Sequence, residues 1–280
     1  MVMFAKDHSV YVRWLGVAGL EFSFGDHILL IDPFLSRPPL RNVFMGRVYP
    51  DIQLIKENIK KADHILITHA HYDHVLDVPA IAKQTGALVY GSANVCRLLQ
   101  VHQVPLAQSL IVHAFGEIKL PYAYVRVIPA RHPFIPGYHS GKLIDNLKPP
   151  LHLRDYRMDK CFSYLIEFEY LKLLVWSSIS TEHAQPADVL FLRSVASQDW
   201  YDKMIEVVQP RLVIPTHWDD FFRTLSQPIR PFFAPPTLSN PFIQPINLDD
   251  FKKRILQSDS TCKILIPHVL ETYDLVAKIL

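Results

Sequence analysis

The stretch ILITHAHYDHVLD, residues 65–77, constrains the fold more than any other part of the chain. It contains most of the short apolar run His64–Thr68, which is typical of a buried strand. Apolar residues then recur at the spacing of one helix face over Val75–Gln84. Where the strand passes into the helix, the chain places four polar side chains that can bind a metal: His69, His71, Asp73 and His74.

The spacing of these residues suits a metal site. Side chains alternate along an extended segment, so His69 and His71 point to the same side and can reach one ion. Asp73 and His74 lie at the turn into the helix, where a second group of ligands can form. Neutral imidazole and carboxylate are ligands for zinc and similar ions. The alternative, that Asp73 only caps the helix, does not explain three histidines within six positions.

The rest of the chain alternates short strands with helices, in two groups. Two sheets packed face to face, with helices outside, would bury these runs. We expect helices over Asp51–Lys61, Asn94–Val101, Asp199–Val208 and Leu248–Gln257. We expect further strands over Tyr11–Trp14, Leu20–Phe24, His27–Ile31, Leu88–Tyr90, Tyr124–Ile128, Phe162–Phe168, Leu171–Trp176, Val189–Leu192, Leu212–Pro215 and Lys263–Ile266.

Two proline-rich segments, residues 133–161 and 226–247, lack a clear periodicity. Long irregular loops in a compact domain are usually functional. The aromatic residues of the second segment would wall an apolar pocket, dock a partner or pack on the body of the protein. The sequence does not decide between these roles.

The pattern H-x-H-x-D-H after a strand resembles the signature of the metallo-β-lactamase superfamily. The opening WLGVAGLEFSF…HILLIDPFLS resembles the start of its lactonase-like and phosphodiesterase-like branches, and the resemblance runs from about Tyr11 to about Pro267. It implies an α/β fold, the four-layer αβ/βα sandwich of two similar halves. We therefore expect one domain over residues 1–280, with halves of roughly 1–120 and 121–280.

The resemblance also implies two more ligands. His132 in VRVIPARHPF and His217 in RLVIPTHWDDF stand where the family carries a histidine after a strand. For His132 the alternative is a surface histidine in a loop. The family's ligand sets then become a three-histidine site (His69, His71, His132) and a second site (Asp73, His74, His217). The cofactor is one or two zinc ions, and manganese or iron also suits the second site.

The chain departs from the family at one position. The family usually carries an aspartate that bridges two metals, and here Ser178 in KLLVWSSIS stands nearest to it. In this respect the sequence resembles the third subclass of true metallo-β-lactamases, in which a serine occupies the position and both metals bind. Glu182 or His183, just downstream, could compensate for the missing carboxylate.

Several other residues are candidates for supporting roles. Asp32 and Asp77 would hold a ligand histidine from outside, although Asp32 before Pro33 also suits a simple turn. His139, Arg154 and Trp218 are candidate substrate contacts, or else solvated and packed loop residues.

Composition narrows the partners. The 29 basic and 27 acidic residues nearly balance, so nucleic acid is not the expected partner. Three distant cysteines predict neither a disulfide framework nor a cysteine–zinc site, and they favour a cytoplasmic location. MVMFAKDHSVYVRW has no uninterrupted apolar core, so we expect no signal peptide. We also expect no membrane span. The oligomeric state stays open.

The sequence thus predicts a metal-dependent hydrolase. A metal-bound hydroxide would attack a small ester, lactone or phosphodiester, and Asp73 would orient it, or accept its proton if the second metal is missing. One alternative is a nuclease of the same superfamily. Another, motivated by Ser178, is a protein that keeps the fold as a non-catalytic binding module.

Overall fold

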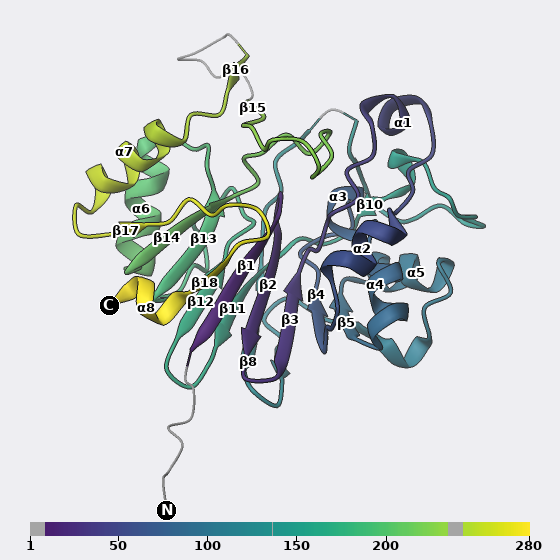
Figure 1. Ribbon diagram of the computed structural model, residues 1–280, viewed down its shortest axis with the longest axis horizontal. Coiled ribbons are helices and arrows are strands. Elements are labelled where there is room, and N and C mark those ends of the chain that lie inside the picture. The colour runs from purple at the N-terminus through teal and green to yellow at the C-terminus, as the bar shows by residue number, and fades with distance from the viewer. Residues whose placement is uncertain (1–8, 136, 235–242) are drawn as a thin grey trace, which may run out of the picture.

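The computed structural model describes residues 9–135, 137–234 and 243–280 (Figure 1). Two seven-stranded sheets dominate it, in the orders β18-β1-β2-β3-β4-β5-β6 and β17-β14-β13-β12-β11-β8-β7. Helices α2, α4 and α5 lie along one outer side, and α6 and α7 lie along the other (Figure 1). The predicted α/β sandwich is confirmed.

The first sheet begins with an antiparallel meander and continues with parallel strands. Its strands are β1 (Val10–Gly16), β2 (Gly19–Phe24), β3 (His27–Ile31), β4 (His64–Leu66), β5 (Leu88–Gly91), β6 (Ser109–Ile111) and β18 (Thr272–Asp274). The helices between them are α1 (Leu40–Met45), α2 (Ile52–Asn58), α3 (Tyr72–Val75), α4 (Val78–Thr85) and α5 (Ala93–Val101).

The second sheet is antiparallel at one end and parallel at the other. Its strands are β7 (Glu117–Lys119), β8 (Tyr124–Pro129), β11 (Phe162–Glu167), β12 (Lys172–Val175), β13 (Val189–Arg193), β14 (Leu212–Thr216) and β17 (Lys263–Ile264). Helices α6 (Gln198–Val208), α7 (Leu248–Ser258) and α8 (Leu275–Ile279) follow the later strands.

Three apolar cores hold the four layers together. Between the sheets, side chains such as Phe22 from β2 and Phe191 from β13 interdigitate, with ring centroids 5.4 Å apart. On the outer face of the first sheet, Ile65 packs against α2, α4 and α5. On the outer face of the second sheet, Leu190 packs against α6 and α7. Because each sheet is buried on both faces, its parallel strands read as nearly continuous apolar runs.

The irregular segments contain some structure that periodicity did not predict. Within residues 133–161 lie a short parallel pair, β9 (His139–Ser140) with β10 (Arg157–Met158), and a 3-10 turn η2 (Leu153–Asp155). Within residues 226–247, β15 (Phe233–Ala234) pairs with β16 (Gln244–Pro245), whereas residues 235–242 lie outside the described residues. Residues 1–8, where no signal peptide is expected, also lie outside them.

Near its end the chain passes from the second sheet, which contains β17, to the first sheet, which contains β18. Strand β18 comes from the last residues of the chain and pairs with β1 at the edge of the first sheet. Among the described residues, no helix combines the length and apolar character that spanning a membrane requires.

Candidate metal centre

The polar cluster forms where strands of both sheets end. In the first sheet β3 and β4 are parallel, so Asp32 and His69 follow them at the same edge. In the second sheet β8, β12 and β14 share one direction, and His132 and His217 follow β8 and β14. The two edges are joined at Thr68, whose carbonyl accepts a hydrogen bond from the Phe162 amide at 2.8 Å.

The first group of ligands is the triad His69, His71 and His132. One ring nitrogen of each lies within 4.8 Å of the other two. His71 Nε2 lies 3.3 Å from the His139 carbonyl, and His132 Nδ1 lies 2.7 Å from the Pro133 carbonyl. These hydrogen bonds fix the ring orientation and leave the opposite nitrogen for a metal.

The second group is the triad Asp73, His74 and His217. One ligand atom of each again lies within 4.8 Å of the other two. Asp73 Oδ2 lies 3.5 Å from His74 Nε2 and 3.3 Å from His217 Nε2. His217 has a left-handed backbone, with φ 57°, and its amide donates to the Val17 carbonyl at 2.8 Å. The two triads adjoin, since the ring centroids of His69 and His74 are 3.9 Å apart. The geometry therefore offers two neighbouring ligand sets.

The electrostatics keep the first triad neutral. Burial, together with repulsion between adjacent imidazoles, lowers the pKa of His69 well below its usual value. Burial also lowers the pKa of His71 to about 3 and that of His132 to about 4. All three rings therefore carry no proton on the ligating nitrogen at neutral pH, which is the state that binds a metal.

The second triad is more polar. Burial opposes the charge on Asp73, but the imidazoles of His74 and His217 hold the pKa of the Asp73 carboxyl well below its usual value. Burial lowers the pKa of His74, but the carboxylates of Asp32 and Asp73 outweigh this and raise it. Asp73 therefore brings a negative charge into a buried site.

Unpartnered atoms show that these residues fit metal ions. His69 Nε2, His71 Nδ1 and Asp73 Oδ1 are buried and have no hydrogen-bond partner among the described residues. Buried polar atoms without partners are costly, so native structures rarely keep them without a function. Three imidazoles suit a zinc ion with an open fourth position, and two imidazoles with a carboxylate suit a second divalent ion.

Asp32 supports this centre from behind His74. Its carboxylate lies 2.7 Å from His74 Nδ1 and also accepts from the amide and hydroxyl of Thr68, at 2.8 Å and 2.5 Å. Such a contact sets which nitrogen of the imidazole carries the proton. The sequence pattern places Thr68 at the end of a strand but indicates no role for it in the site. Its position directly before the first histidine was the only signal.

Comparison with known proteins now identifies the family. A family profile described as "Beta-lactamase superfamily domain" matches residues 27–171, just over half of the 280-residue chain. The chain belongs to the β-lactamase superfamily. The matched segment holds every residue of the two triads except His217.

Relatives and solved structures agree with this assignment. A protein named UPF0173 metal-dependent hydrolase, from Symbiobacterium thermophilum, is 29% identical over 213 residues, which are 75% of this chain and 84% of that protein. Igni18 from Ignicoccus hospitalis, described as a novel metallo hydrolase, covers 95% of this chain and 97% of its own with TM-score 0.57 and 15% identity.

The Bacillus subtilis metallo-beta-lactamase fold protein YhfI covers 96% of this chain and 100% of its own with TM-score 0.59 and 12% identity. At such identities the structures show a shared fold. The predictions of the superfamily and of a metal-dependent hydrolase are confirmed.

In this superfamily member, Ser178 is a structural contact of the His132 loop. Its hydroxyl accepts from the Arg131 amide at 3.0 Å and from the Ser180 amide at 3.1 Å, and it is buried. Glu182 is exposed and pairs with the Arg131 guanidinium at 2.9 Å. Neither Ser178, Glu182 nor His183 belongs to the two triads.

The remaining candidates lie around the centre in different ways. Asp77 is buried and accepts from the amides of Leu35 and Ser36, so it holds that loop. Burial raises the pKa of Asp77 to about 6. The side chains of His139 and Arg154 are exposed. Trp218 is buried and stacks on Trp14 between the sheets, with ring centroids 5.0 Å apart. The supporting roles predicted for these residues stay predictions.

The sequence pattern did not predict a contact between Tyr138 and the first triad. Tyr138, from the irregular segment after His132, packs its ring edge-to-face against that of His71, with an interplanar angle of 74° and centroids 4.7 Å apart. It therefore covers one side of the three-histidine triad. Its position in a segment without periodicity gave no sign of this contact.

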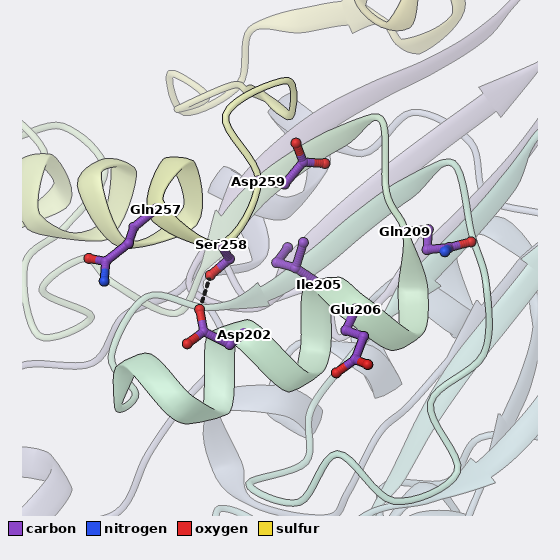
Figure 2. Close-up of a pocket in the computed structure, with 7 residues that line it drawn as sticks. All are labelled: Asp202, Ile205, Glu206, Gln209, Gln257, Ser258 and Asp259. Atoms are coloured by element: carbon purple, nitrogen blue, oxygen red, sulfur yellow. Dashed lines mark hydrogen bonds between the residues drawn. The ribbon is translucent and has the colours of Figure 1, made fainter.

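A cavity of the described structure lies away from both triads. A hollow of about 640 Å³ between α6 and α7 is lined by acidic, amide and apolar side chains (Figure 2). Asp202 in its wall accepts a hydrogen bond from Ser258 at 2.6 Å (Figure 2). No residue of either triad lines it.

Proposed function

We propose that this chain hydrolyses a small ester or lactone at a two-metal centre held by His69, His71 and His132 on one side and Asp73, His74 and His217 on the other. The observation that carries the proposal is the pair of adjoining ligand sets, in which buried nitrogen and oxygen atoms lack protein partners. A purely structural cluster of histidines would use those atoms for hydrogen bonds within the protein.

Divalent ions held by these two triads would acidify a water molecule so that it could attack at neutral pH, and would stabilise the negative charge that develops on the substrate oxygen. The chain's own residues order the reaction. Asp73 stays ionised, because the imidazoles around it hold its pKa low. Its Oδ1 has no hydrogen-bond partner among the described residues, so it can accept a hydrogen bond from the attacking water and orient it.

The surroundings of the centre favour an uncharged substrate. In the described part of the chain, no lysine or arginine side chain forms a hydrogen bond or ion pair with any of the six ligands. Arg131, the cation next to His132 in sequence, is paired with Glu182. A phosphodiester carries a charge that proteins usually meet with arginine or lysine.

Apolar groups lie next to the ligands instead. The ring of Phe221 packs against that of His217, with ring centroids 5.8 Å apart, and the ring of Tyr138 packs against that of His71. Phe134, two residues after His132, is 89% exposed. An exposed aromatic side chain two residues from a metal ligand would offer a contact to an apolar part of a substrate. This supports an ester or lactone with an apolar group.

Hydrolysis assays on metal-free and zinc-reconstituted protein test the proposal. We expect turnover of aryl esters and acyl lactones that depends on added metal, with weaker turnover of a generic phosphodiester and none of single-stranded or double-stranded DNA. His71→Ala should remove the activity, since it deletes a ligand of the first site. A folded His69→Ala/His71→Ala variant with full activity would refute the site.

A preference for the phosphodiester would overturn the substrate class but keep the centre. Turnover of nucleic acid would support the nuclease instead. No turnover of any substrate by protein that holds two ions would support a non-catalytic binding module.

A further inference from the structure

A fully buried ion pair lies behind the second triad. The side chains of Arg37 and Asp219 are both 0% exposed, and Arg37 Nη2 lies 2.5 Å from Asp219 Oδ2. Arg37 Nη1 donates to the carbonyls of Asp220 and Arg223, at 3.3 Å and 3.4 Å. The pair therefore joins the loop after β3 to the loop after β14, which carries His217.

The other oxygen of Asp219 extends this connection to the metal ligand. Asp219 Oδ1 accepts from the Val17 amide at 2.9 Å. The Val17 carbonyl in turn accepts from the His217 amide at 2.8 Å and from Trp14 Nε1 at 3.1 Å. A continuous series of hydrogen bonds thus runs from the Arg37 guanidinium to the backbone of His217.

The backbone along this series is held in an unfavourable conformation. Val17 and His217 have φ of 52° and 57°, in the left-handed region, and this conformation is rare for the β-branched Val17. Arg37 itself has φ 42°. Gly16 leaves room for the pair, because a Cβ at that position would lie 1.9 Å from Arg37 Nη2. Strained residues persist only where their surroundings fix them, and they cluster at functional sites.

A buried ion pair is weak evidence for a gain in stability, because desolvation offsets much of the attraction. Stability alone therefore does not explain why this ion pair is buried next to the loop that carries His217. We propose that the Arg37–Asp219 pair positions His217, and so determines whether the second metal site can bind its ion. The proposal rests on the two-metal centre proposed above, and it makes Arg37 and Asp219 positioning residues of that centre.

Metal-binding measurements on metal-free protein test this role. Zinc titration against a competing chelator gives separate affinities for the two sites. We expect Asp219→Asn and Arg37→Lys to lower the second-site affinity at least tenfold and to leave the three-histidine site within about twofold. Arg13→Met is the control, because it removes the Arg13–Glu21 pair, also 2.5 Å, from β1 and β2, the hairpin whose turn holds Val17. It should change neither affinity.

The double variant Arg37→Met/Asp219→Asn guards against misfolding, because it leaves no unpaired buried charge. If these variants fold and bind two ions with unchanged affinities, the proposal is wrong. An equal fall at both sites would also overturn it, since a general structural role predicts that result. If the wild-type protein binds fewer than two ions, the two-metal centre fails instead, and the two failures are thereby distinguished.

Discussion

Asp32→Asn is the substitution whose effect the structure predicts most closely. The carboxylate of Asp32 lies 2.7 Å from His74 Nδ1, and the two side chains are only 1% and 4% exposed. The Asp32 carboxylate requires the proton of His74 on Nδ1, which leaves Nε2 as the metal ligand. An asparagine would keep one oxygen for the Thr68 amide, at 2.8 Å. Its amide nitrogen, however, would face His74 and favour the opposite tautomer.

The magnitude follows from two separate considerations. A hydrogen bond to a charged group contributes about 1.5–3 kcal/mol, and burial leaves little water to replace it here. Loss of a partner behind a metal ligand lowers metal affinity about 10–100-fold, which corresponds to about 1.4–2.7 kcal/mol. The two ranges agree. We therefore expect second-site affinity to fall 10–100-fold, and the three-histidine site to change less.

Zinc titration against a chelator measures both affinities. Asp63→Asn is the control, because Asp63 Oδ2 likewise accepts a backbone hydrogen bond, from the Ile28 amide at 2.7 Å, but takes no part in either triad. Circular dichroism and the thermal midpoint establish that each variant folds. A folded Asp32→Asn protein with wild-type affinity at the second site would refute the reasoning.

Two other consequences can be measured. Because burial lowers the pKa of His71 from 6.5 to about 3, the folded metal-free protein keeps it neutral while the unfolded chain takes up a proton below 6.5. As the pH is lowered from 6.5 to 3, protonation of this residue in the unfolded chain should therefore reduce the free energy of unfolding by about 1.4 kcal/mol per pH unit. Urea unfolding at several pH values should show a flatter slope for His71→Ala, and an equal slope would contradict the assignment. Ser178→Ala removes the acceptor for the amides of Ser180 and of Arg131, the residue before His132, and should cost about 1–3 kcal/mol of stability. It should also weaken the three-histidine site more than the second, and an unchanged first site would show that Ser178 does not support His132.

Much of the sandwich could be predicted, because its strands are buried on both faces and bounded by turns. Strand β4 and helix α4 follow from the apolar run and the helical spacing on either side of His69. Strand β18, in contrast, is three residues long at the sheet edge and was not predicted. Its pairing with β1 depends on a contact between the two ends of the chain, which local periodicity does not report.

The residues of the candidate centre likewise fall into those that the sequence predicts and those that only the fold reveals. His69, His71, Asp73 and His74 are adjacent in sequence, so their spacing alone predicted a metal site. His132 and His217 were predicted from a family resemblance. In the structure a ring nitrogen of each lies within 4.8 Å of the ligand atoms of its triad. Arg37 could not have been identified, because an arginine in a proline-rich turn gives no sign that it is buried. Only the fold places it against Asp219.

A crystal structure of the zinc-loaded protein, with anomalous scattering measured at the zinc edge, tests the central claim most directly. The account predicts two anomalous peaks, one among His69, His71 and His132 and one among Asp73, His74 and His217. No peak at the triads, or peaks only at other surface groups, would contradict it.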